Sequence, residues 1–119
     1  MTTEEDVRRI CLSLPESVEV SYERLPGFRV RKKLFARIRQ KPDALVVMRP
    51  HIDEKLALID SAPDKYFQTP HYEGHHAVLV RMDAIEVSEL EELLTESWIV
   101  TAPAKLVARF REDLELNAS

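Results

Sequence analysis

Apolar residues recur at helical spacing near the ends of the chain and at alternating spacing in its middle. The first such set, at i, i+3, i+4 and i+7, is Val7, Ile10, Cys11 and Leu14. This spacing forms one face of an amphipathic helix. Thr2 and Glu5 match a capping box, and Pro15 cannot continue a helix. The pattern therefore predicts a helix over residues 3–14.

The middle of the chain alternates between apolar and basic residues. After a connector that extends through Ser21, the stretch GFRVRKKLFARIRQK has the period of two that a half-buried strand shows. It predicts a β-hairpin that ends near Gln40. Lys41-Pro42-Asp43 then supplies a turn, and the apolar run ALVVM at residues 44–48 predicts a third strand. Three consecutive strands predict an antiparallel meander.

Turn signals divide the segment that follows. Asp53 begins a short helix, which Pro63 ends. Glu73-Gly74 is a tight-turn dipeptide, and the apolar run from Ala77 to Arg81 predicts a strand. The segment TPHYEGHHAVLVRMD is therefore predicted to form a second hairpin.

Two helices are predicted to close the chain. Ser88 and Glu91 match another capping box. One face of the helix that follows carries Leu90, Leu93, Leu94 and Trp98. Pro103 suits the first position of a last helix, because that position needs no backbone N–H. The apolar positions of this helix, four residues apart, are Leu106, Phe110 and Leu114.

The predicted element order is α-β-β-β-α-β-β-α-α. It indicates an α+β fold of two layers, with an antiparallel sheet of about five strands and helices packed on one face. A chain of 119 residues that is 45% hydrophobic suits a single domain, residues 1–119. No apolar run approaches the roughly 20 residues that cross a bilayer. The first residues, MTTEEDVRRI, are acidic where a secretory signal is basic, so the predicted location is the cytoplasm.

Charge adds a functional indication. From Arg24 to Lys41 the chain carries eight Lys or Arg and no Asp or Glu, although the net charge is -4. One face of the predicted hairpin is therefore cationic and can meet an anion. The residues expected to contact phosphate are Arg29, Arg31, Lys32, Lys33, Arg37 and Arg39. Phe35 could stack or insert if it shares that face. Charged residues on the solvent side of a hairpin also simply prevent edge-to-edge aggregation, and this alternative stays open.

Composition excludes several catalytic classes. Gly27 and Gly74 are the two glycines, too few for a phosphate-binding loop of the P-loop or dinucleotide type. The single cysteine, Cys11, lies in an apolar helical face and is expected to be a buried, inert thiol. The serines lack the GxSxG turn of a serine nucleophile. We therefore expect a non-enzymatic protein without a cofactor.

The histidines of the second hairpin invite a metal hypothesis. His71 and His76 could face one another across the hairpin, but a zinc site needs three or four ligands and Glu73 is the only further candidate nearby. No metal site is predicted. Tyr72 could border a pocket with Trp98, but Trp98 continues a helical apolar face and is expected in the core. His51 is expected to cap or pack at the start of the second helix.

The order and spacing of these segments resemble the MmcQ/YjbR family of small bacterial proteins, in the style of actinobacterial members. The resemblance rests on FRVRKKLFARI, on TPHYEGHHAVLVRMD and on the helix that leads to Ala102-Pro103, and it spans nearly the whole chain. It implies a CyaY-like fold with two protruding hairpins, a double wing predicted to bind DNA. The implied second wing would carry His71, Tyr72, His75 and His76.

One departure from the family concerns the first hairpin turn. Family members usually have glycine there, where this chain has Arg31-Lys32-Lys33. Because residues with a Cβ rarely adopt positive φ, we expect a three-residue loop with one left-handed residue, which keeps Val30 and Leu34 on the same face.

Together these features predict a DNA-binding protein that contacts the phosphate backbone with weak or no sequence specificity. The alternative is a protein-interaction or small-ligand module of unknown ligand. The acidic helix would repel DNA if it lay beside the basic hairpin. The exposed strand edges could also pair with a second copy as a homodimer.

Overall fold

The computed structural model describes residues 2–118. The α-helices are α1 (Glu4–Ser13), α2 (Ile52–Ser61), α3 (Val87–Thr101) and α4 (Ala104–Ala118), and two short 3-10 helices are η1 (Pro70–Tyr72) and η2 (Met82–Ala84). The strands are β1 (Ser17–Tyr22), β2 (Leu25–Val30), β3 (Lys33–Arg39), β4 (Ala44–Met48), β5 (Tyr66–Phe67) and β6 (Ala77–Val80). They form one antiparallel sheet in the order β1-β2-β3-β4-β6-β5.

The predicted α+β class is confirmed, with six strands in place of about five. Two of the six were not predicted as strands: β1, where a connector through Ser21 was expected, and the short β5, where a turn was expected. Strand β1 has a physical reason to be missed. Its side chains stay partly or fully exposed, with Val18 at 47% exposure, so it lacks the continuous apolar signal of an interior strand. Because β1 flanks β2 and β4 flanks β3, the basic hairpin lies inside the sheet and is not a protruding wing.

The hairpin turns are tight. Glu23 and Arg24 both have positive φ, 51° and 70°, and join β1 to β2 as a type I′ turn. Arg31, with φ 57°, and Lys32 form the turn between β2 and β3, so the predicted three-residue loop is wrong.

A register shift follows the second turn. Opposite the step from Phe28 to Arg29, β3 contains one additional residue, Phe35. Because of this bulge, Phe35 and Ala36 both enter the core, whereas Leu34 turns to the other face of the sheet, away from Val30. The predictions that Val30 and Leu34 share a face, and that Phe35 could reach an outer ligand, are therefore wrong.

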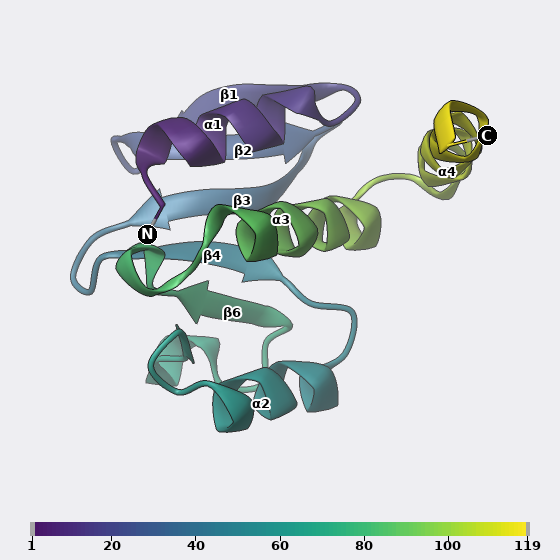
Figure 1. Ribbon diagram of the computed structural model, residues 1–119. Helices are drawn as coiled ribbons and strands as arrows, with labels where there is room; N and C mark the ends of the chain where they lie inside the picture. Colours follow the sequence, from purple (N-terminus) through teal and green to yellow (C-terminus); the bar gives the residue numbers. More distant parts are fainter. Residues whose placement is uncertain (1, 119) are drawn as a thin grey trace.

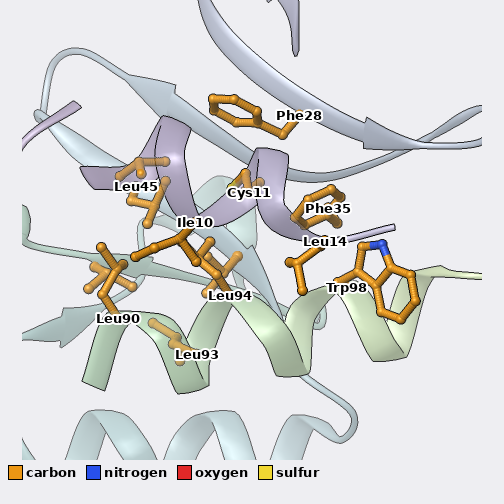
Figure 2. Close-up of a cluster of buried hydrophobic side chains, with 14 of the residues drawn as sticks. Ile10, Cys11, Leu14, Phe28, Phe35, Leu45, Leu90, Leu93, Leu94 and Trp98 are labelled. Carbon is orange, nitrogen blue, oxygen red and sulfur yellow. The ribbon is translucent and has the colours of Figure 1, made fainter. Parts of the chain in front are cut away.

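The main core lies between the sheet and two helices. Figure 1 shows α1 and α3 lying across one face of the sheet. The buried side chains drawn in Figure 2 include Ile10 and Cys11 of α1, Phe28 and Phe35 of the sheet, and Trp98 of α3. Burial of each large apolar side chain contributes about 1.5–3 kcal/mol. The predicted core positions of Cys11 and Trp98 are confirmed.

The helix termini differ from the predicted capping boxes by a residue or more. At α1 the box is formed by Thr3 and Asp6, whose side chain and backbone bond reciprocally, and not by Thr2 and Glu5. At α3 the N-cap is Glu86 with no side-chain cap, so the box predicted at Ser88 does not form. His51 occupies the N-cap position of α2, also without a side-chain bond, and its carbonyl accepts from Lys55 N at 3.1 Å.

The last helix leaves the body of the molecule beyond α3. The carbonyl of Pro103 accepts from Val107 N at 3.0 Å, so Pro103 precedes the first turn of α4. Phe110 packs on Trp98 with ring centroids 4.9 Å apart, but Leu114 is 52% exposed. Figure 1 shows the rest of α4 extending away from the sheet. Within residues 2–118, no helix has the length and apolarity that crossing a membrane requires.

The predicted second hairpin is wrong in its first half. The turn at Glu73-Gly74 forms, with Gly74 at φ 79° and His75 N donating to Tyr72 O at 3.0 Å. The residues before it form η1 instead of a strand, because Pro70 suits the start of a helical turn and cannot donate to a sheet. The segment 68–76 thus folds over the sheet and does not project as a wing.

Candidate functional site

The sheet face opposite α1 and α3 is only partly covered, and we call it the open face. Side chains alternate along each strand, so the neighbours of core residues point to it. Its residues on β1 to β3 are Val18, Val20, Tyr22, Leu25, Gly27, Arg29, Leu34, Arg37 and Arg39. Those on β4 to β6 are Ala44, Val46, Met48, Phe67, Ala77 and Leu79.

Arg37 lies near the middle of the open face between two tyrosines. Its guanidinium carbon is 5.0 Å from the centroid of the Tyr22 ring, within cation–π range. Its Nη2 donates to the Tyr72 hydroxyl at 2.7 Å, and Nη1 lies 3.7 Å from the exposed carboxylate of Glu23. With 14% of its side chain exposed, Arg37 is mainly held by these contacts.

Arg39 and Arg81 extend the positive charge across the face. The guanidinium carbon of Arg39 is 5.8 Å from the Tyr72 ring centroid, and Nη2 donates to Lys41 O at 3.2 Å. The Nε of Arg39 is shielded from solvent but makes no hydrogen bond. Arg81 lies over the Phe67 ring at 4.0 Å. Arginines above aromatic rings keep their outer N–H groups available to an anion.

The segment 68–76 covers the open face over β4 and β6. Tyr72 is buried there in a small cluster with Val46 and Leu79. The rings of His71 and His75 are stacked with centroids 6.0 Å apart. His76 instead contacts Arg49 O through Nδ1 at 3.2 Å, so the predicted approach of His71 to His76 does not occur. In the described part of the chain, no three His, Cys, Asp or Glu side chains gather as a metal site would need.

A buried lysine fastens this segment. Lys55 of α2 is fully buried, and its ammonium donates to Tyr72 O and His75 O, both at 2.7 Å. Burial lowers the pKa of the Lys55 ammonium, an effect that the carboxylate of Glu73 opposes. The two carbonyls are thereby satisfied in the interior, which holds the Tyr72 side chain against Arg37.

The six cations predicted at the site do not form one group. Arg29, Arg37 and Arg39 share the open face. Arg31 at the hairpin tip pairs with Glu16, Nε to Oε1 at 2.5 Å, so part of its charge is neutralised. Lys32 and Lys33 are exposed beside it, and Lys33 lies opposite Val30, on the helix side.

Four residues of this surface were not predicted as site residues: Tyr22, Lys41, Thr69 and Arg81. Tyr22 closes the alternating VEVSY of β1, which was the available signal for that strand. Thr69 and Arg81 carry no local signal, because tertiary packing of segment 68–76 and of β5 brings them to the open face.

Acidic side chains gather on the opposite side of the sheet. Glu19 of β1 points toward α1 and accepts from Arg8 Nε at 2.6 Å, which lowers the pKa of Glu19. Glu91 of α3 lies 3.8 Å from Arg9 of α1. The sheet thus separates the acidic helix from the open-face arginines, so the acidic helix does not lie beside the basic face, where it would repel DNA.

Comparison with known proteins supports this picture at the level of family. The family model described as YjbR matches residues 12–99, well over half of the chain. The chain belongs to the YjbR family. The MmcQ/YjbR resemblance noted from sequence is therefore confirmed.

Relatives of this YjbR-family protein occur in mycobacteria. Uncharacterized protein Rv2570 of Mycobacterium tuberculosis is 39% identical over 127 residues, which cover 92% of this chain and 96% of the relative. Uncharacterized protein Mb2600 of Mycobacterium bovis matches with the same identity and coverage. These relatives are consistent with the predicted actinobacterial type.

A solved structure also matches this YjbR-family chain. The crystal structure of Deinococcus radiodurans protein DR2400, described with a DUF419 domain, has a TM-score of 0.72 and 25% sequence identity. The match covers 84% of this chain and 78% of that one. The two proteins therefore share the arrangement of sheet and helices.

Proposed function

We propose that this YjbR-family protein binds DNA through the phosphate backbone, using the arginines of the open face, with weak or no sequence specificity. The observation that carries the proposal is the separation of charge by the sheet. Arg29, Arg39 and Arg81 lie on one side, whereas the acidic residues of α3 lie on the other. A local cationic surface can bind phosphate even when the net charge is -4.

The residue types of the open face support DNA binding without sequence specificity. Arginine forks match phosphate oxygens, and the 41% exposed Tyr22 ring offers a surface on which a base of a single strand can stack. Few side chains of this face could read base edges, so the affinity is expected to depend little on sequence. Because neither hairpin projects from the sheet as a wing, the open face suits a single strand better than insertion into a groove of a duplex.

The proposal includes no catalytic step. Burial raises the pKa of the Cys11 thiol far above its usual range, which removes it as a nucleophile. The rings of His71 and His75 contact one another and the Tyr72 ring, an arrangement that lacks the hydrogen-bonded base and nucleophile of a catalytic pair. A cytoplasmic location fits DNA binding and stays a prediction.

Matched charge variants test the proposal. We expect the face variant Arg29→Gln/Arg39→Gln to weaken binding of a labelled single-stranded oligonucleotide by about tenfold or more at low salt. The slope of log K against log salt should fall by roughly two, about one per lost phosphate contact. Fluorescence anisotropy at two or more salt concentrations, with single-stranded and duplex oligonucleotides, measures both quantities.

The control variant Lys105→Gln/Arg109→Gln removes the same charge from exposed positions on α4. It should change the affinity less than twofold. A second control, Lys32→Gln/Lys33→Gln, removes the same charge at the hairpin tip. If the face and α4 variants lose equal affinity, or if the parent protein shows no salt-sensitive binding, the proposal is wrong.

A protein-interaction role is the second candidate, and the edge strand β1 favours it. Val18 and Tyr22 are 47% and 41% exposed on the open face, next to an unpaired strand edge. A peptide or a second copy could add a strand there. Binding of that kind depends on backbone pairing and apolar contact, so its salt dependence should be much flatter than that of phosphate binding.

A further inference from the structure

The open face contains a hollow where β3 ends. Its volume is about 470 Å³, in the range of small-ligand sites. Arg37 and Arg39 of β3, Lys41 of the following turn, and Thr69 and His71 of segment 68–76 line it. With Glu23 of the turn before β2 and Leu25 of β2, residues from three separate parts of the chain converge on one concave surface.

The electrostatic balance of the hollow is positive. Arg37, Arg39 and Lys41 contribute three cations, and Glu23 is the carboxylate among the lining residues. Glu23 is 72% exposed and lies 3.7 Å from one nitrogen of Arg37, so it leaves most of this charge uncompensated. The excess of two positive charges matches a phosphate monoester, which carries close to two negative charges at neutral pH.

Two polar groups at the hollow have no partner. Arg39 Nε and Thr69 Oγ1 are both shielded from solvent without a hydrogen bond. An unpaired buried donor costs about 1–3 kcal/mol. An oxyanion seated between Arg39 and Thr69 can accept from both after a small side-chain rotation, which would remove that cost.

The backbone at the rim also points to a constrained site. Lys41 adopts φ 58°, a left-handed conformation that is uncommon for a residue with a Cβ. This conformation places Lys41 beside the hollow, and its carbonyl accepts from Arg39 Nη2 at 3.2 Å. The turn thus holds two cations at one edge of the hollow.

We infer that this hollow binds a phosphate monoester, either the terminal phosphate of a nucleic-acid strand or that of a free mononucleotide. Arg39 and Lys41 neutralise the phosphate, and Thr69 and His71 donate to its remaining oxygens. The terminal-phosphate form of this inference rests on the proposed function, because it adds an end contact to backbone binding along the open face. The mononucleotide form does not depend on it.

The test compares two oligonucleotides that differ only at the 5′ end. Single strands labelled at the 3′ end, with a 5′-phosphate or a 5′-hydroxyl, are titrated by fluorescence anisotropy. The expected result is about tenfold tighter binding of the phosphorylated strand. A tenfold change is what the free energy of one charge-assisted hydrogen bond produces. Adenosine 5′-monophosphate should compete at this site, whereas adenosine should not.

Variants of single residues test whether the preference for the 5′-phosphate arises at the hollow. Lys41→Gln and Thr69→Val should each abolish most of the preference for the phosphorylated end. Arg29→Gln, on the same face but outside the hollow, should weaken both strands equally and keep the preference. Circular dichroism and thermal unfolding confirm that each variant is folded.

The outcomes separate this inference from the proposed function. Equal affinity for the two ends together with no competition by adenosine 5′-monophosphate, or a preference that persists in both hollow variants, overturns the inference while salt-sensitive backbone binding still stands. If no oligonucleotide binds but adenosine 5′-monophosphate causes chemical-shift changes at Lys41 and Thr69, the phosphate site is supported and the proposed function is wrong.

Discussion

At the scale of single residues, one buried hydroxyl forms hydrogen bonds with backbone groups at the bulge in β3 and at the end of β4. Ser97 of α3 is fully buried and donates to Phe35 O at 2.5 Å. Ser97 Oγ in turn accepts from Met48 N at 2.8 Å. The bulge and the end of β4 each leave a backbone group without a strand partner, and Ser97 pairs with both.

Replacement of this hydroxyl tests its role. We expect Ser97→Ala to lower the free energy of unfolding by about 1–3 kcal/mol, because two buried backbone groups lose their partner. The midpoint and slope of urea denaturation measure the change. Ser88→Ala, at an exposed position of the same helix, is the control and should lie within about 0.5 kcal/mol of the parent. Equal stability of the two variants would contradict this account.

At the scale of elements, the hairpin turns contain residues with strained, positive φ angles, and these tight turns fix the register of the strands. Glu23 and Arg24 both adopt the left-handed region, where Asn and Gly are favoured. This type I′ turn matches the twist of β1 and β2. It also places Tyr22 opposite Leu25, so that the Tyr22 ring lies beside Arg37.

Relief of this strain should stabilise the protein. We expect Glu23→Asn/Arg24→Gly to raise the free energy of unfolding by about 1 kcal/mol, since both replacements adopt positive φ more readily. Thermal and urea unfolding measure it. Glu23→Ala/Arg24→Ala removes the same two charges but keeps a Cβ at both positions, so it should bring no gain in stability. A Glu23→Asn/Arg24→Gly variant no more stable than the parent would show that the turn is not strained.

At the scale of the whole molecule, ion pairs and the sheet divide the charges. On the helix side Glu89 of α3 accepts from Lys65 Nζ at 2.7 Å and from the Tyr66 hydroxyl. The hydrogen bond from Lys65 is the main cause that lowers the pKa of Glu89. Burial and the same carboxylate raise the pKa of Tyr66. These contacts join β5 to α3 behind the open face.

The lowered pKa makes a prediction for acid stability. An unfolded glutamate has a pKa of 4.5, so the Glu89 contribution is complete above that pH and is lost as pH falls through the lower folded pKa. Glu89→Gln should therefore lose up to about 1 kcal/mol at pH 7 and lose less than the parent on acidification to about pH 3. Urea midpoints across this range measure both, and Glu92→Gln, exposed on the same helix, should follow the parent curve. A Glu89→Gln curve parallel to that of the parent would refute the assignment.

The amino-acid sequence by itself determined the local elements. Helical apolar spacing placed α1 and α3, continuous apolar runs placed β4 and β6, and the turn at Gly74 followed from its dipeptide. These signals are local because periodicity and turn chemistry involve residues close in sequence. The same applies to the run of cations between Arg24 and Lys41.

Only the tertiary structure decided which of those cations share one face of the sheet. A two-residue turn and the bulge at Phe35 set the register of β3, and a shift of one residue moves a side chain to the other face of a sheet. Arg37 and Arg39 therefore reach the open face, although Phe35 does not. Thr69 arrives from a segment distant in sequence, because packing of Tyr72 and the ammonium of Lys55 fold that segment over the sheet. Contacts of this kind depend on register and long-range packing, which no local pattern encodes.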